Sequence, residues 1–153
     1  MDANTASSSG NRDLVLVLDT DHLSILGDDT PASLALLQRL EASGEDVVTT
    51  IVSVEENLRG WLSEIHRASD PRRQISAYDR LKRRVEWFGG WVILPLDTES
   101  AERFAAFRRD GIRIGSMDLK IACIALAHDA KVLTRNTTDF AQVPGLKFAN
   151  WLD

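Results

Sequence analysis

Short apolar runs separated by longer amphipathic stretches set the pattern of this chain. Residues 14–18 (LVLVL) are apolar without interruption, and residues 47–52 (VVTTIV) are mostly β-branched. A continuous apolar run is typical of a strand that is buried on both faces of a parallel sheet. Similar short runs at 91–94, 131–134 and 146–150 predict three further strands, the last of them at an edge.

Helical spacing and helix-start signals fill the stretches between these runs. Thr30 followed by Pro31 predicts a helix start, and leucines recur along one face of the segment after it. The other predicted helices cover 53–69, 71–88, 98–111 and 117–130, with a helical turn near 137–140. Strands that alternate with helices through short loops predict a three-layer α/β domain with a central, mostly parallel sheet of four to five strands.

Length and composition agree with one globular domain over residues 14–153. The chain has 153 residues, of which 44% are hydrophobic and 27% charged. Residues 1–13 are polar and small, and we expect them to form a flexible tail outside the fold. No apolar stretch approaches the roughly 20 residues needed to span a bilayer. The single cysteine, Cys123, lies in an apolar helix, which favours a buried filler and a reducing, cytoplasmic location.

The charge pattern leaves two interpretations open. A net charge of −5 argues against nucleic acid as a partner. However, seven basic residues lie between Arg67 and Arg84 against only two acids, and a second basic group lies at 108–113. These groups are either solvated helix faces or a rim that contacts phosphates or a partner, and charge alone does not choose between them.

Acidic residues follow the predicted strand ends. Asp19 ends the first strand, Glu55 and Glu56 follow the second, and Asp139 follows the fourth, while Asp118 opens the helix before it. In parallel α/β sheets the carboxyl ends of the strands share one edge, where ligands bind. Each acid has an ordinary explanation at a helix N-terminus. Gathered together they repel, at roughly 4 kcal/mol for two carboxylates about 4 Å apart in an effective dielectric of ~20.

A cation or protonation must therefore neutralise such a cluster. Carboxylate oxygens are hard ligands, which favour Mg²⁺ or Mn²⁺. Zinc is disfavoured because the three histidines are scattered and show no ligand spacing.

Four segments in order resemble the PIN-domain nucleases, and most closely the VapC-like toxic ribonucleases of toxin–antitoxin pairs. They are LDTDHLS, TIVSVEENLRG, GSMDLKIACIALAHDAKVLTRNTTDF and VPGLKFANW. The resemblance runs from Leu14 to Trp151. It implies a PIN-like fold whose metal-binding and catalytic acids are Asp19, Glu56, Asp118 and Asp139. Glu56 is preferred to Glu55 because the family's acid stands four residues before a glycine, here Gly60.

The resemblance also implies residues that support the acids, namely Thr20, Asp21, Ser53 and Asn136. Two positions depart from the family pattern. Asp21 stands where the family often has Asn, and Asn57 stands where an apolar residue usually follows the glutamate.

The implied activity is hydrolysis of RNA phosphodiesters with Mg²⁺ or Mn²⁺, carried out by the toxin of a toxin–antitoxin pair. Basic residues must then attract the RNA. The candidates are Arg72, Arg73, Arg113 and, nearest to the acids, Arg135. The resemblance further implies a cognate antitoxin and a homodimer. Trp61 is the better candidate for the antitoxin groove, and we expect Trp87 to lie in the core.

Two rival functions fit part of the same pattern. LVLVLDTD matches the D-x-D of haloacid-dehalogenase-like phosphatases, with Asp19 as nucleophile and Asp21 as acid/base. That motif predicts Thr or Val where this chain has Leu23. A non-catalytic, receiver-like metal-binding module shares the acids after the first strand, but it does not need Glu56 and Asp139 together.

Overall fold

A computed structural model describes residues 14–153, and the tail expected at 1–13 lies outside the described residues. Five strands form one sheet: β1 (Val15–Leu18), β2 (Asp46–Thr50), β3 (Ile93–Leu94), β4 (Lys131–Leu133) and β5 (Lys147–Ala149). Their order is β3-β2-β1-β4-β5, and every neighbouring pair is parallel. This confirms the predicted α/β fold, and all strands end at the same edge.

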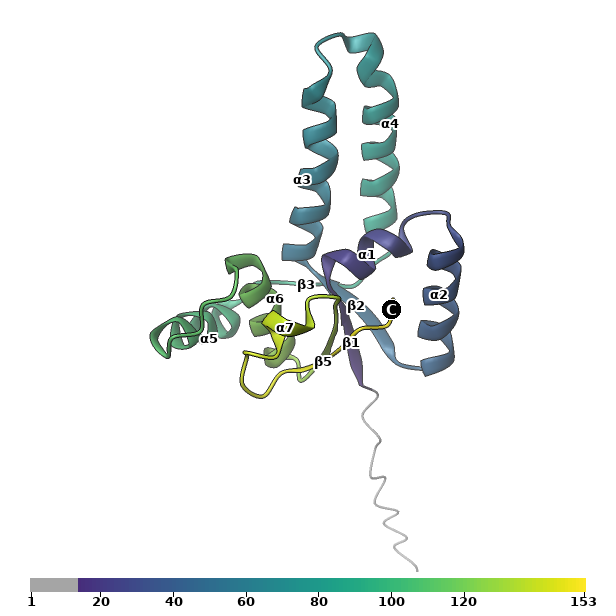
Figure 1. Cartoon of the computed structure of the whole chain (residues 1–153). Helices are drawn as coiled ribbons and strands as arrows, with labels where there is room; N and C mark the ends of the chain where they lie inside the picture. Colours follow the sequence, from purple (N-terminus) through teal and green to yellow (C-terminus); the bar gives the residue numbers. More distant parts are fainter. Residues whose placement is uncertain (1–13) are drawn as a thin grey trace, which may run out of the picture.

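Seven helices surround this sheet (Figure 1): α1 (Thr20–Leu26), α2 (Pro31–Ser43), α3 (Ile51–Arg67), α4 (Pro71–Phe88), α5 (Thr98–Arg109), α6 (Ser116–Ala127) and α7 (Thr137–Phe140). None of them, within residues 14–153, combines the length and hydropathy needed to cross a bilayer.

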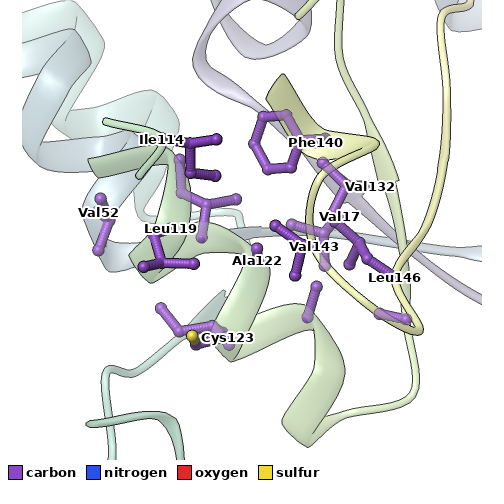
Figure 2. Packing of buried hydrophobic residues seen from close by; sticks show 14 of the residues in the cluster. Val17, Val52, Ile114, Leu119, Ala122, Cys123, Val132, Phe140, Val143 and Leu146 are labelled. Carbon is purple, nitrogen blue, oxygen red and sulfur yellow. The ribbon is translucent and has the colours of Figure 1, made fainter. Parts of the chain in front are cut away.

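Alternation along the central strand β1 divides the core into two layers. Val17 points to one face of the sheet and packs with Val132 and with Leu119 and Ala122 of α6 (Figure 2). Leu16 and Leu18 point to the other face, where buried residues of α1, α2, α3 and α4 cover them. Both faces of β1 are therefore buried, which explains why its sequence is uninterruptedly apolar.

The register of β1 places two chain segments side by side at the site edge. Leu18 lies opposite Thr49 of β2 and Leu133 of β4. The backbone N–H of Asp19 donates to the carbonyl oxygen of Leu133 at 3.0 Å. The residues that follow β1 and β4 consequently meet directly after the strands end.

Some predicted boundaries differ from the structure, and one helix was not predicted. β2 ends at Thr50, whose hydroxyl accepts from the backbone N–H of Ser53 and caps α3, so Ile51 and Val52 are helical. Helix α6 starts at Ser116, one residue before the predicted start at 117, and ends at Ala127 instead of 130. The short helix α1, capped by Asp19, was not predicted from the sequence.

Helices α3 and α4 form a hairpin that stands out from the rest of the molecule (Figure 1). Its turn is held by Gln74, whose Nε2 donates to the carbonyl oxygens of Ile65 and Ala68. The base of the hairpin, near the first turn of α3, lies at the carboxyl edge of the sheet because α3 follows β2 directly.

Candidate acidic site at the carboxyl edge of the sheet

Asp19 is a buried carboxylate directly after β1, with only 5% of its surface exposed. Its Oδ1 accepts from the backbone N–H of Thr20 at 2.7 Å, and its Oδ2 accepts from the hydroxyl of Thr134 at 2.7 Å. Burial, with the charges of Asp21 and Asp118, raises the pKa of Asp19 to about 7, although both hydrogen bonds oppose the shift. The ionised form of Asp19 is thus costly in this fold.

Asn136 joins two further acids from different segments. Its Nδ2 donates to Asp118 Oδ2 at 2.8 Å and to Asp139 Oδ2 at 2.9 Å. The backbone N–H of Asn136 donates to the hydroxyl of Thr134, which itself donates to Asp19. Burial and the charges of Asp139 and Asp21 raise the pKa of Asp118, and the bond from Asn136 opposes them.

Glu56 approaches from the first turns of α3. Its Oε1 accepts from the hydroxyl of Thr20 at 3.1 Å, and burial together with the charge of Asp118 raises its pKa. Glu55 is exposed and pairs instead with Arg59 on the same helix. Of the two adjacent glutamates, only Glu56 contacts a residue of the acidic site.

Asp118 is the common neighbour of the predicted acids, because its charge acts on Asp19 and Glu56 and it is itself affected by Asp139. Nevertheless, among residues 14–153 no group of three or more His, Cys, Asp or Glu side chains is arranged so that it could hold a metal ion. The donors fit a hard divalent cation in kind, since all are carboxylate oxygens with an unfavourable excess of negative charge. In the described arrangement the amide of Asn136 lies between two of them.

His22, which sequence reasoning treated as an ordinary histidine, anchors Asp21 beside this site. His22 is fully buried, and its Nε2 accepts from the backbone N–H of Trp151 at 3.1 Å. Nδ1 therefore carries the proton and donates to Asp21 Oδ1 at 2.5 Å. The other oxygen of Asp21 accepts from the backbone N–H of Arg135 at 2.9 Å.

These bonds act on the pKa of Asp21 in the opposite direction from burial. Burial raises it, but the bonds from His22 and Arg135 outweigh burial and leave the pKa below its ordinary value.

The remaining predicted residues differ in how directly they are connected to the acids. Ser53 is buried at the start of α3 and contacts Thr50. The side chain of Arg135 pairs with Asp153, so its link to the site is through its backbone. Arg113 donates to the carbonyl oxygen of Arg108. Arg72 and Arg73 begin α4 at the free end of the hairpin, away from the end that carries Glu56 (Figure 1).

Thr134 is a site residue that sequence reasoning missed. It is fully buried directly after β4 and donates to Asp19. Its position after a strand at the carboxyl edge, the same signal that identified Asp19, could have found it. Nothing local in the sequence distinguishes His22 except its place next to Asp21.

The PIN domain model matches residues 16–146, and the chain therefore belongs to the PIN domain family. PIN domains are generally nucleases and typically use a divalent metal. This membership favours the nuclease interpretation over the phosphatase and the receiver-like module.

Solved structures share this fold. VapBC2 of Rickettsia felis, bound to a DNA fragment from its promoter, has a TM-score of 0.64 at 20% identity, covering 90% of this chain and 99% of that one. FitAcB of Neisseria gonorrhoeae has a TM-score of 0.63 at 24% identity, with 88% and 96% covered. DNA-bound VapBC of Salmonella typhimurium has 0.61 at 21%, with 90% and 98% covered. No curated protein matches the chain.

Proposed function

We propose that this protein is a divalent-metal-dependent endoribonuclease and the toxin of a toxin–antitoxin pair. The observation that carries the proposal is the set of contacts at the carboxyl edge. Thr134 joins Asp19 to Asn136, and Asn136 joins Asp118 to Asp139. A PIN domain with four acids in this neighbourhood suits phosphodiester hydrolysis.

Asp19, Glu56, Asp118 and Asp139 would hold Mg²⁺ or Mn²⁺. When bound, such a cation binds the scissile phosphate, lowers the pKa of an attacking water and stabilises the leaving oxyanion. The role of the chain's other residues is to position these acids. Thr20 orients Glu56, Thr134 orients Asp19, and Asn136 keeps Asp118 and Asp139 close together.

The proposed partners are an RNA substrate, a cognate antitoxin and a second copy of the chain. Support comes from a toxin–antitoxin complex of Klebsiella pneumoniae that shares the fold. It also comes from α4, where Ile75, Tyr78 and Val85 are 67%, 55% and 53% exposed. Apolar side chains in such a row are typical of a surface that another protein covers. We place the protein in the cytoplasm, where RNA is available.

The decisive experiment compares wild type with Asp19→Asn in cleavage of total cellular RNA, with Mn²⁺, Mg²⁺ or EDTA. We expect wild-type cleavage with metal, none with EDTA, and a loss of at least a hundredfold in the variant. Asp46→Asn is the matched control, because Asp46 is exposed at the opposite end of β2. Equal cleavage by wild type and Asp19→Asn would exclude this site.

A further inference from the structure

His22 is a buried histidine whose two ring nitrogens both have partners. It has no exposed surface, and its Nε2 accepts from the backbone N–H of Trp151 at 3.1 Å. Its Nδ1 donates to Asp21 Oδ1, as a neutral imidazole can when its other nitrogen accepts. Trp151 itself packs against the core and lies under the guanidinium of Arg39, which is 4.5 Å from the ring centroid. The ring of His22 is therefore held between a packed segment and Asp21.

The bonds of His22 fix the direction of the Asp21 carboxylate. Oδ1 accepts from the ring of His22 and from its backbone N–H, at 2.5 and 2.6 Å. The other oxygen, Oδ2, accepts from the backbone N–H of Arg135 at 2.9 Å. The last side-chain torsion of an aspartate is broad, so the carboxylate would turn readily without the rigid ring beside it. His22 consequently directs Oδ2 toward residues 134–136, the connection between β4 and α7.

This connection holds three of the four proposed metal ligands. Thr134 donates to Asp19 at 2.7 Å, and Asn136 donates to Asp118 and Asp139 at 2.8 and 2.9 Å. The backbone N–H of Asn136 also donates to the hydroxyl of Thr134 at 3.0 Å, which links the two side chains. A shift of the connection would therefore move the donors that hold three acids.

Backbone N–H groups attach the connection on both sides. The N–H of Thr134 donates to the carbonyl oxygen of Ala149 on β5 at 2.9 Å, and the N–H of Arg135 donates to Asp21. The first bond continues the sheet, whereas the second depends on a side chain that His22 directs. A displacement of about 1 Å can cost about a hundredfold in rate at a catalytic site, so the second bond matters for the acids.

We propose that His22 is a positioning residue of the acidic site. Its ring acts through Asp21 on residues 134–136, and through these on the arrangement of Asp19, Asp118 and Asp139. The ring bonds to Asp21 and Trp151 and not to the four acids themselves. The inference rests on the proposed function, because it assigns His22 a role in the same metal site.

The alternative is a purely structural role, since a buried histidine with two hydrogen bonds also stabilises the fold. The two bonds can be removed separately. His22→Asn keeps an amide N–H near the position of Nδ1, which can donate to Asp21, but the side chain is too short to reach Trp151. His22→Gln reaches the position of Nε2 and keeps an acceptor for Trp151, but it loses the donor to Asp21. Only a positioning role predicts that these two variants differ at the acids.

The first measurement uses the full chain in EDTA and follows the side-chain NH₂ group of Asn136 by NMR, with Asn136→Ser identifying its two signals. In wild type we expect both protons downfield of exposed amide groups, because both donate to carboxylates. His22→Asn should keep this shift, and His22→Gln should lose it. His128→Gln is the matched control, because His128 is exposed at the end of α6.

The second measurement titrates the same proteins with Mn²⁺ by calorimetry. His22→Gln should weaken binding by about 10- to 100-fold, as loss of a residue that supports metal ligands does, and His22→Asn should rescue most of this loss. Asp21→Ala, at a side chain that is 26% exposed, should also weaken binding. Adding His22→Gln to Asp21→Ala should cause no further loss, because His22 acts through Asp21.

Equal losses in His22→Asn and His22→Gln overturn the proposal, and so do unchanged Asn136 signals in His22→Gln. An undiminished effect of His22→Gln in the Asp21→Ala background overturns it as well. If His22→Gln does not fold, Asp21→Ala takes its place, and unchanged Asn136 signals in that variant are the contrary result. Wild type that binds no Mn²⁺ refutes the metal site of the proposed function, while the Asn136 signals in EDTA still test His22.

Discussion

Asp19→Asn should stabilise the metal-free protein at neutral pH, although it removes a proposed catalytic residue. The carboxylate is 5% exposed, and burial raises its pKa from 3.8 to about 7. Asparagine keeps an oxygen for the N–H of Thr20, and its amide can donate to the Thr134 hydroxyl. The substitution therefore removes a buried charge while it can retain both contacts.

The pH dependence of this stability difference follows from the linkage between proton binding and folding. Between pH 3.8 and about 7 the folded protein binds a proton at Asp19 that the unfolded chain has lost. The stability that protonated Asp19 contributes is present below pH 3.8 and is lost as the pH rises through about 7. A shift of about three pKa units corresponds to about 4 kcal/mol. The advantage of the variant should thus grow from near zero at pH 4 to as much as about 4 kcal/mol at pH 8.

Urea unfolding in EDTA, followed by circular dichroism at several pH values, measures this difference. Added Mn²⁺ should then stabilise wild type and leave Asp19→Asn unchanged, because a cation relieves the same excess charge. A variant that is less stable than wild type at pH 8, or a difference in stability that is the same at pH 4 and pH 8, would refute a raised pKa of Asp19.

Three further outcomes are expected. Asp21→Asn should have the opposite effect and destabilise the protein at pH 7, because the pKa of Asp21 is lowered. This loss should diminish as the pH falls below 3.8 and vanish only below the lowered pKa of the folded state, and urea titrations that show no loss at pH 7 would contradict it. Gly27→Ala should lower the melting temperature, because the added Cβ would displace Arg84. Gly60→Ala, whose Cβ meets nothing within 4 Å, should instead raise the stability by about 0.5–1 kcal/mol. Equal effects of the two substitutions in a thermal scan would exclude the contact between Gly27 and Arg84 as the cause. Burial raises the pKa of the Cys123 thiol to about 11, so iodoacetamide at pH 8 should label it only after denaturation, as mass spectrometry can check.

Local patterns were enough to predict most elements of the fold. The uninterrupted apolar run at 14–18 is the central strand, and the helices predicted to start at Pro31 and at residue 98 do start there. These signals depend on neighbours within a few residues. The short helix α1 escaped because its cap, Asp19, also ends a strand, and seven residues carry little periodic signal.

Boundaries between a strand and a helix were less predictable, because a capping hydrogen bond can override the strand preference of the residues next to it. The β-branched residues Ile51 and Val52 favour a strand, but the hydroxyl of Thr50 caps α3 before them. A single hydrogen bond thus outweighed local propensity, which spans only about 1 kcal/mol for strands.

The sequence by itself determined which residue types follow the strands, and therefore that carboxylates gather at one edge. Only the tertiary structure decided how they are held. Thr134 reaches Asp19 across 115 residues, and Trp151 reaches His22 across 129. Such partners are selected by strand register and by the packing of helices on the sheet, which short-range patterns do not encode. The same holds for Arg84, whose burial against Gly27 joins α4 to α1 and forms a cleft beside the acids.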